Sequence, residues 1–181
     1  MGPKGRGSNM AAIIKACQDG EISASVAVVV APREETPALA EARAMGVSGA
    51  VVAPSEDGYG QDLLRALEGC NVLCLAGYLR LLPDEVLRAF ADRILNVHPS
   101  LLPKFGGKGM YGIRVHEAVI AAGETESGAT VHLVTEHYDE GRILVQRTCP
   151  VFPGDTPASL AERVLAEEHR AYVEALQQVL G

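Results

Sequence analysis

Residues 93–112, which read RILNVHPSLLPKFGGKGMYG, place two polar side chains in a segment with the apolar composition of a buried strand. Asn96 and His98 stand two positions apart, so on a strand their side chains share one face. An amide and an imidazole side by side can donate hydrogen bonds to an oxygen that gains negative charge during a reaction. The pair could instead be structural, bonded to loop backbone and within the core.

Two more residues downstream could join them. His132 shares a strand face with Thr130, and Asp139 follows in the turn HYDEG. An aspartate ahead of a glycine is commonly turn chemistry. Two histidines and a carboxylate can also ligate iron, but such sets usually have a close pair of ligands on one element, which is not the case here. We therefore expect no metal.

Both ends of the chain offer a weaker signal. GPKGRGSN, residues 2–9, is a glycine-rich turn that leads into a helix. Backbone N–H groups there, with the side chains of Ser8 and Asn9, suit a phosphate, although the same residues are ordinary helix caps. Glu168 and His169 lie in an amphipathic C-terminal segment, where a solvated helix face is the plainer interpretation.

Hydrophobic periodicity predicts alternating elements around these residues. We expect helices at residues 9–19, 34–45, 59–67, 83–91 and 113–122, and a last helix from Pro157 almost to the C-terminus. The first helix is expected to be capped by Ser8 or Asn9 and the last by Thr156. We expect strands at 25–31, 49–54, 71–77, 93–97, 127–136 and 142–151.

The order of these elements predicts an α/β fold with an open, mostly parallel sheet and helices on both faces, ending in a β-hairpin and a long helix. Residues 1–181 are expected to form one domain. Ligands bind beyond the carboxyl ends of the strands in such sheets, where Asn96, His98 and residues 78–80 fall.

The composition excludes several classes of protein. With 181 residues and 48% hydrophobic residues, the chain is large and apolar enough to bury a core. The net charge of -7 and the absence of a basic stripe disfavour a nucleic-acid groove. The four cysteines lack zinc-site spacing and are expected to be free thiols. No apolar run has membrane length and no secretory signal is visible, so we predict a cytoplasmic protein without a membrane partner.

Five motifs in order, GRGSN, LAGYLRLL, ILNVHPSLLP, SGATVHLVTEHYDEG and RVLAEEH, together resemble the glycinamide ribonucleotide formyltransferase family of folate-dependent enzymes. They cover almost the whole chain. The resemblance implies a Rossmann-like fold and formyl transfer from 10-formyltetrahydrofolate to the amine of glycinamide ribonucleotide, in de novo purine biosynthesis. It also implies small-molecule substrates, no metal, and a monomer or homodimer.

The resemblance further assigns roles to individual residues. It implies that the catalytic residues are Asn96, His98 and Asp139, with Thr130 and His132 in support. It implies that the substrate phosphate and ribose are bound by Gly7, Ser8, Asn9 and Glu168. It implies a folate slot lined by Leu79, Arg80, Leu81, Leu82, Val134 and Glu136. The segment KFGGKGMYG, residues 104–112, is expected to be a flexible loop that closes over a ligand.

The chain departs from the family pattern in two places. Family members have an apolar strand before GRGSN, in the middle of the sheet, whereas only MGPK precedes Gly5 here, so we expect that strand to be missing and a neighbouring edge to invite self-association. Arg142 stands where the family commonly has proline. The alternatives are a formyltetrahydrofolate hydrolase, another formyltransferase, or a non-catalytic ligand-binding relative that has lost the first strand.

Overall fold

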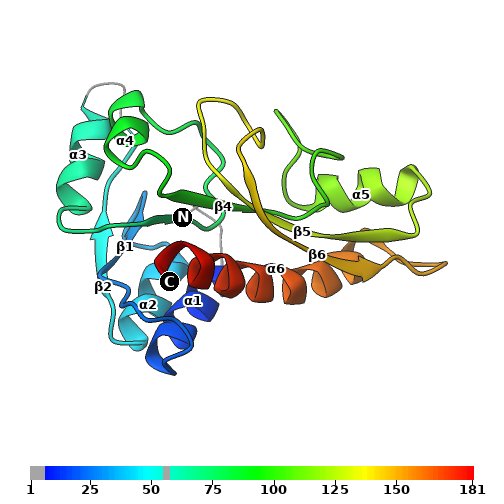
Figure 1. The fold of residues 1–181 in the computed structure, drawn as a ribbon, viewed down its shortest axis with the longest axis horizontal. Helices are drawn as coiled ribbons and strands as arrows, with labels where there is room; N and C mark the ends of the chain where they lie inside the picture. The colour runs from blue at the N-terminus through cyan, green and yellow to red at the C-terminus, as the bar shows by residue number, and fades with distance from the viewer. Residues whose placement is uncertain (1–6, 55–57) are drawn as a thin grey trace.

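The first half of the chain forms parallel strand pairs joined by helical crossovers (Figure 1). The computed structural model describes residues 7–54 and 58–181. Strands β1 (Val28–Ala31) and β2 (Ser48–Val51) pair in parallel around α2 (Pro37–Ala44), and β3 (Leu73–Leu75) and β4 (Ile94–His98) pair in parallel around α4 (Asp84–Ala89). Helix α3 (Tyr59–Ala66) connects the two pairs. Parallel neighbours require such crossovers, since a tight turn cannot join them.

The second half is antiparallel. Strands β5 (Glu126–Leu133) and β6 (Ile143–Pro150) form the predicted hairpin, and β5 also pairs antiparallel with β4. Among the described residues the strands therefore form a two-stranded sheet, β1-β2, and a four-stranded sheet, β3-β4-β5-β6. Helix α5 (Ile113–Ala121) precedes the hairpin and α6 (Pro157–Leu180) follows it. The α/β fold class is confirmed.

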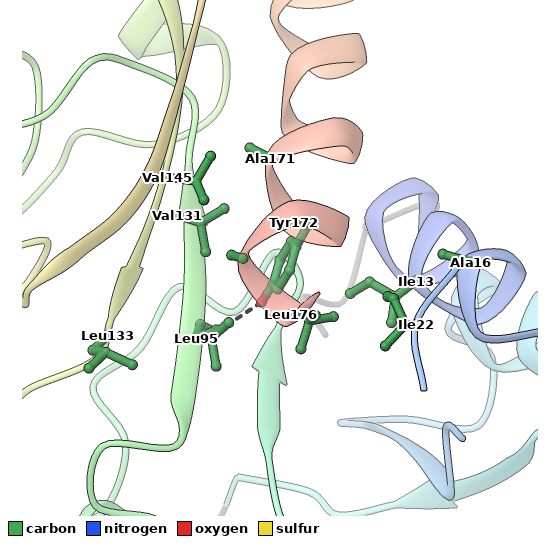
Figure 2. Packing of buried hydrophobic residues seen from close by; sticks show 11 residues of the cluster. Ile13, Ala16, Ile22, Leu95, Val131, Leu133, Val145, Ala171, Tyr172 and Leu176 are labelled. Carbon is green, nitrogen blue, oxygen red and sulfur yellow. Dashed lines mark hydrogen bonds between the residues drawn. The ribbon is translucent and has the colours of Figure 1, made fainter. Parts of the chain in front are cut away.

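Helices cover both faces of the larger sheet, as predicted. On β4, Ile94 packs into a cluster with residues of α3 and α4, whereas Leu95 packs into a cluster with residues of α1 (Ser8–Gln18) and α6. Figure 2 shows Tyr172 of α6 in the second cluster, with its hydroxyl bonded toward Leu95. The hydroxyl oxygen of this fully buried tyrosine is 2.9 Å from the carbonyl oxygens of both Leu75 and Leu95, so α6 is fastened to β3 and β4.

A cleft of about 690 Å³ lies between the two sheets. It is lined mainly by apolar residues of β1, β3 and their flanks, with contributions from α1 and the end of α6. Asn96, His98 and Asp139 are not among its lining residues. The prediction that the family's first strand is missing concerns residues 1–6, which lie outside the described residues.

Two helix starts show where cap prediction succeeds and fails. Thr156 caps α6 with a capping box, in which its side chain accepts from the Ser159 N–H and the Ser159 hydroxyl accepts from the Thr156 N–H. The predicted cap of α1 by Ser8 or Asn9 is wrong, because Gly7 takes the N-cap position with a φ of 81° and Ser8 is already helical. No helix in the described ranges is long and apolar enough to cross a membrane.

Candidate active site

Strands β4 and β5 bring four polar side chains onto one face. Asn96 and His98 share a face of β4 because they are two residues apart. The antiparallel register places Asn96 opposite His132 and His98 opposite Thr130. The predicted juxtaposition of these side chains is therefore present, and both histidines are buried.

Asp139, in the turn between β5 and β6, lies against both histidines. Its Oδ2 is 3.4 Å from Nδ1 of His98, and its Oδ1 is 3.5 Å from Nε2 of His132. The side chain is only 11% exposed, and the backbone N–H of Gly107 donates a hydrogen bond to Oδ2 at 2.9 Å. The structure thus joins residues that are widely separated in the sequence into one cluster.

Hydrogen bonds to main-chain carbonyls fix the tautomers of the two imidazoles. Nε2 of His98 is 2.8 Å from the carbonyl oxygen of Phe105, so Nε2–H donates and Nδ1 faces Asp139. Nδ1 of His132 is 2.9 Å from the carbonyl oxygen of Leu133 and donates to it. Nε2 of His132 lies 3.2 Å from the Asn96 amide nitrogen and 3.5 Å from Oδ1 of Asp139. The second N–H of that amide can serve another acceptor.

The electrostatics keep the carboxylate charged and the imidazole neutral. Burial lowers the pKa of His98, and Asp139 and the Phe105 carbonyl oppose this only in part, so the pKa lies below its ordinary value. Burial acts to raise the pKa of Asp139, but His132, His98 and the Gly107 amide together bring it below its ordinary value. Near neutral pH, Asp139 is ionised and His98 can receive a proton at Nδ1, the nitrogen that faces the carboxylate.

A buried hydrogen-bond network supports the segment after His98. The Thr130 hydroxyl donates to the Ser100 carbonyl at 2.6 Å and accepts from the Leu102 N–H and the Gln146 amide, each at 3.0 Å. Gln146 also donates to the Leu102 carbonyl at 2.9 Å. Sequence reasoning missed Gln146, whose position directly opposite Thr130 on β6 follows from a strand register that the sequence does not give.

Sequence reasoning also passed over a third buried histidine. His116 of α5 is 4% exposed, and its Nδ1 has no hydrogen-bond partner in the described part of the chain. Burial, with a smaller contribution from His98, lowers its pKa to about 4. Its place on the apolar face of a helix, three residues before Val119, was the available signal.

The residues expected to bind phosphate and ribose meet at the start of α1. The Asn9 amide nitrogen donates to Oε2 of Glu168 at 2.6 Å, which joins α1 to α6. The Oδ1 atom of Asn9 and Nε2 of His169 are buried and have no partner among the described residues. Burial raises the pKa of Glu168 above its ordinary value, against the effect of Asn9. Glu168 therefore does not lie on a plainly solvated helix face.

The residues expected to line the folate slot follow the carboxyl ends of β3 and β5. Leu79 and Leu81 are exposed, whereas Leu82 is buried in the cluster with α3 and α4. The N–H of Val134 donates to the Ile94 carbonyl at 2.9 Å, which holds the start of the opposite loop beside β4.

Three side chains near the predicted slot remain at the surface: Arg80, Glu136 and Arg142. The carbonyl oxygen of Arg142 accepts from the Leu133 N–H at 2.9 Å, a bond that the carbonyl of a proline at this position could also accept. No group of three potential metal ligands with suitable geometry occurs in residues 7–54 and 58–181.

Comparisons with known proteins identify the family of the chain. The sequence pattern of the formyl transferase family matches residues 4–176. A chloroplastic phosphoribosylglycinamide formyltransferase of Arabidopsis thaliana is 44% identical over 179 residues, which are 95% of this chain and 61% of that protein. The phosphoribosylglycinamide formyltransferase of Escherichia coli is 34% identical over 174 residues, 93% of this chain and 80% of that protein.

Solved structures give the same result. The crystal structure of glycinamide ribonucleotide transformylase 1 from Symbiobacterium toebii superposes with a TM-score of 0.90 at 39% identity, covering 99% of this chain and 85% of that one. That of the phosphoribosylglycinamide formyltransferase from Brucella melitensis gives 0.89 at 41% identity, covering 99% and 93%. The chain therefore belongs to the formyl transferase family.

Proposed function

We propose that this chain transfers the formyl group of 10-formyltetrahydrofolate to the amine of glycinamide ribonucleotide, a step of de novo purine biosynthesis. The observation that carries the proposal is the contact of Asp139, from the turn after β5, with His98 on the face of β4 that also carries Asn96. The names of the relatives and of the superposed structures point to the same reaction. Since the chain spans 61% of the Arabidopsis relative, the activity, substrates and partners are inferred for this chain.

The N-terminus of α1 is the proposed site for the ribonucleotide phosphate. Gly7 leaves the first backbone N–H groups of the helix without a side-chain cap, and Ser8 adds a hydroxyl. Such a terminus favours an anion through free N–H groups and the helix dipole. Glu168, held by Asn9, has a second carboxylate oxygen for the ribose hydroxyls. In this proposal these contacts hold the phosphate and ribose of the ribonucleotide, and the cluster around His98 receives its amine.

Attack of the amine on the formyl carbon forms a C–N bond and leaves negative charge on the former carbonyl oxygen. The free N–H of Asn96 and a protonated Nδ1 of His98 are the proposed donors to this oxygen. Donors held in place before the reaction stabilise developing charge without having to reorganise. His98 is placed for this role because the Phe105 carbonyl already occupies Nε2–H.

Asp139 is proposed to assist the proton transfers of the reaction. The attacking amine must lose a proton and the departing folate nitrogen must gain one when the old C–N bond breaks. Asp139 is ionised, buried and 3.4 Å from Nδ1 of His98, so it can stabilise the imidazolium and accept the proton, directly or through water.

The remaining assignments follow from the same proposal. The proposed pterin slot lies between Leu79–Leu82, which follow β3, and the loop that contains Val134 and Glu136, which follows β5 and is bonded to β4 through Val134. We further propose that residues 1–181 form one formyltransferase domain that acts in the cytoplasm as a monomer or homodimer.

The test is formyl transfer by the purified chain. The chain is mixed with 10-formyltetrahydrofolate, with and without glycinamide ribonucleotide, and loss of the formyl group is followed by absorbance. We expect turnover only with the ribonucleotide. Turnover without it would assign a hydrolase, and no turnover by a folded chain that binds both ligands would contradict the proposal. His98→Ala and Asp139→Asn should each abolish most turnover and leave folate affinity nearly intact; unchanged turnover in either would refute the assigned roles.

A further inference from the structure

One turn of the chain contacts both proposed proton carriers. The carbonyl of Phe105 accepts from Nε2–H of His98 at 2.8 Å, and the N–H of Gly107 donates to Oδ2 of Asp139 at 2.9 Å. Only Gly106 separates the two contacts. The turn thus uses its backbone alone to bind one partner from β4 and one from the loop after β5.

An unusual backbone makes both contacts possible. Phe105 has a φ of 56° and Gly107 a φ of 91°, so both are in the left-handed region that most side chains avoid. Gly106 lies so close to its surroundings that an added Cβ would be 2.5 Å from Cδ2 of Leu102 and 3.4 Å from Cβ of Asp139. Backbone held in sparsely populated regions clusters at functional sites, where the surrounding structure enforces it.

The bond from Gly107 reaches the carboxylate oxygen that faces His98. Oδ2 is both the acceptor of this bond and the atom 3.4 Å from Nδ1 of His98, while Oδ1 lies toward His132. Fixing Oδ2 therefore fixes the rotation of the carboxylate between the two imidazoles.

We propose that Gly107 is a positioning residue whose backbone amide holds the Asp139 carboxylate against His98. This inference rests on the proposed function, because it assigns the amide a purpose in proton transfer. It implies that the position of the Asp139 carboxylate depends on the loop of residues 104–112. If the turn moves away, Asp139 loses the hydrogen bond that holds it against His98.

The charged surroundings of Asp139 give the proposal a measurable consequence. His98 faces the carboxylate from β4 and His132 from β5, while His116 of α5 faces His98. The Gly107 amide adds a neutral donor that favours the ionised form of Asp139. When that donor is displaced and both histidines remain, the pKa of Asp139 should rise.

Gly107→Ala and Gly109→Ala are a matched pair for the test. The two glycines have φ values of 91° and 90°, and an added Cβ would meet nothing within 4 Å at either position. The substitutions therefore impose a similar backbone strain in the same loop. Gly107 differs from Gly109 in its bond to Asp139 and in a carbonyl that accepts from the Met110 N–H at 3.1 Å, and of these two bonds only the first contacts the carboxylate.

The measurement is a titration of Asp139 by carboxyl carbon NMR, which needs no substrate and no turnover. Alanine keeps the backbone N–H, but its strain at a φ of 91° should move that N–H away from Oδ2. We expect the midpoint to rise in Gly107→Ala, by about one pH unit for complete loss of the bond, since a hydrogen bond to a charged group is typically worth that much. Gly109→Ala should keep the wild-type midpoint. The amide proton shift of residue 107 reports whether its N–H has left Oδ2. Equal shifts of the Asp139 midpoint in both variants, or an unchanged midpoint in a Gly107→Ala protein whose residue-107 amide has moved, would overturn the proposal. If formyl transfer fails but the midpoints separate, only the proposed function is refuted.

Two further readouts are available, and the first of them needs no variant. In the wild-type protein, the amide proton shift of Gly107 should titrate with the same midpoint as the Asp139 carboxyl, and an independent midpoint would count against the bond. In an active enzyme, the acid limb of the kcat profile should move upward by the same amount in Gly107→Ala. If the acid limb of the kcat profile does not move, the Gly107 amide has no role in proton transfer.

Discussion

The hydroxyl of Thr130 offers a sharp test of how the site is supported. The residue is fully buried, and its hydroxyl makes hydrogen bonds with the Leu102 N–H, the Gln146 amide and the Ser100 carbonyl. Thr130→Val keeps the size and branching of the side chain and removes only the oxygen's hydrogen bonds. The substitution therefore isolates the polar contribution.

The expected loss follows from the partners that are left behind. The Leu102 N–H would lose its acceptor in a buried position, which costs about 1–3 kcal/mol, and the Ser100 carbonyl would lose a donor at about 1 kcal/mol. Gln146 would still donate to the Leu102 carbonyl. We expect the free energy of unfolding to fall by about 3 kcal/mol, which is a large part of the typical 5–15 kcal/mol but leaves a folded protein.

Urea unfolding followed by circular dichroism measures this loss, and an unchanged m-value would show that the denatured state is unaffected. Thr130→Ser is the matched control, because it keeps the hydroxyl and removes a buried methyl group at about 1 kcal/mol. Thr130→Val should also lower kcat, since residues 100–102 directly follow His98. If Thr130→Val costs no more than Thr130→Ser, the hydroxyl network does not support the site and our reasoning fails.

Three further predictions address other parts of the molecule. Ser8→Ala combined with Asn9→Ala should raise KM for the ribonucleotide about tenfold, the value of roughly one net hydrogen bond, and leave KM for folate unchanged; an equal rise in both would refute the phosphate site. Tyr172→Phe should lower the free energy of unfolding by about 1 kcal/mol, whereas the same change at exposed Tyr111 should alter it by less than about 0.5 kcal/mol. His116 has a folded pKa of about 4, below its ordinary 6.5, so the unfolded chain binds more protons between these values and stability falls as pH falls. In urea titrations, the titration of His116 should make the free energy of unfolding about 2 kcal/mol lower at pH 5 than at pH 7. A His116→Gln variant whose free energy of unfolding has the same pH dependence as the wild type would contradict this assignment.

Much of the site could be predicted from the sequence because its geometry follows from strand periodicity. Asn96 and His98 share a face on any strand that contains both, whatever surrounds it. The order of the elements placed that strand end at the ligand-binding edge of an α/β sheet. These inferences needed neither register nor loop shape. The structure confirms that Asn96 and His98 lie on β4 near its carboxyl end, and the binding of ligands at this edge stays a prediction.

The supporting contacts could not be predicted, because they depend on how strands and helices are aligned with one another. Gln146 reaches Thr130 only because β5 and β6 pair in one register, and a shift between Val131 and His132 alters that register within the hairpin. Asn9 was expected to cap its own helix, yet its side chain donates to Glu168 on α6. The sequence favoured a partner within the same helix for Asn9, whereas the structure shows a partner on α6, which is distant in the sequence.

Asp139 shows why two interpretations of one residue need not compete. An aspartate before a glycine is commonly a turn residue, and Asp139 is one, with a φ of 59° that aspartate and asparagine tolerate better than most residues. That same backbone conformation carries the carboxylate to within 3.5 Å of both histidines. Asparagine can adopt the conformation but lacks the charge, whereas alanine would disturb both. Asp139→Asn therefore separates the role of the charge from the role of the turn, and a large loss of turnover in a variant of unchanged stability would assign the effect to the charge.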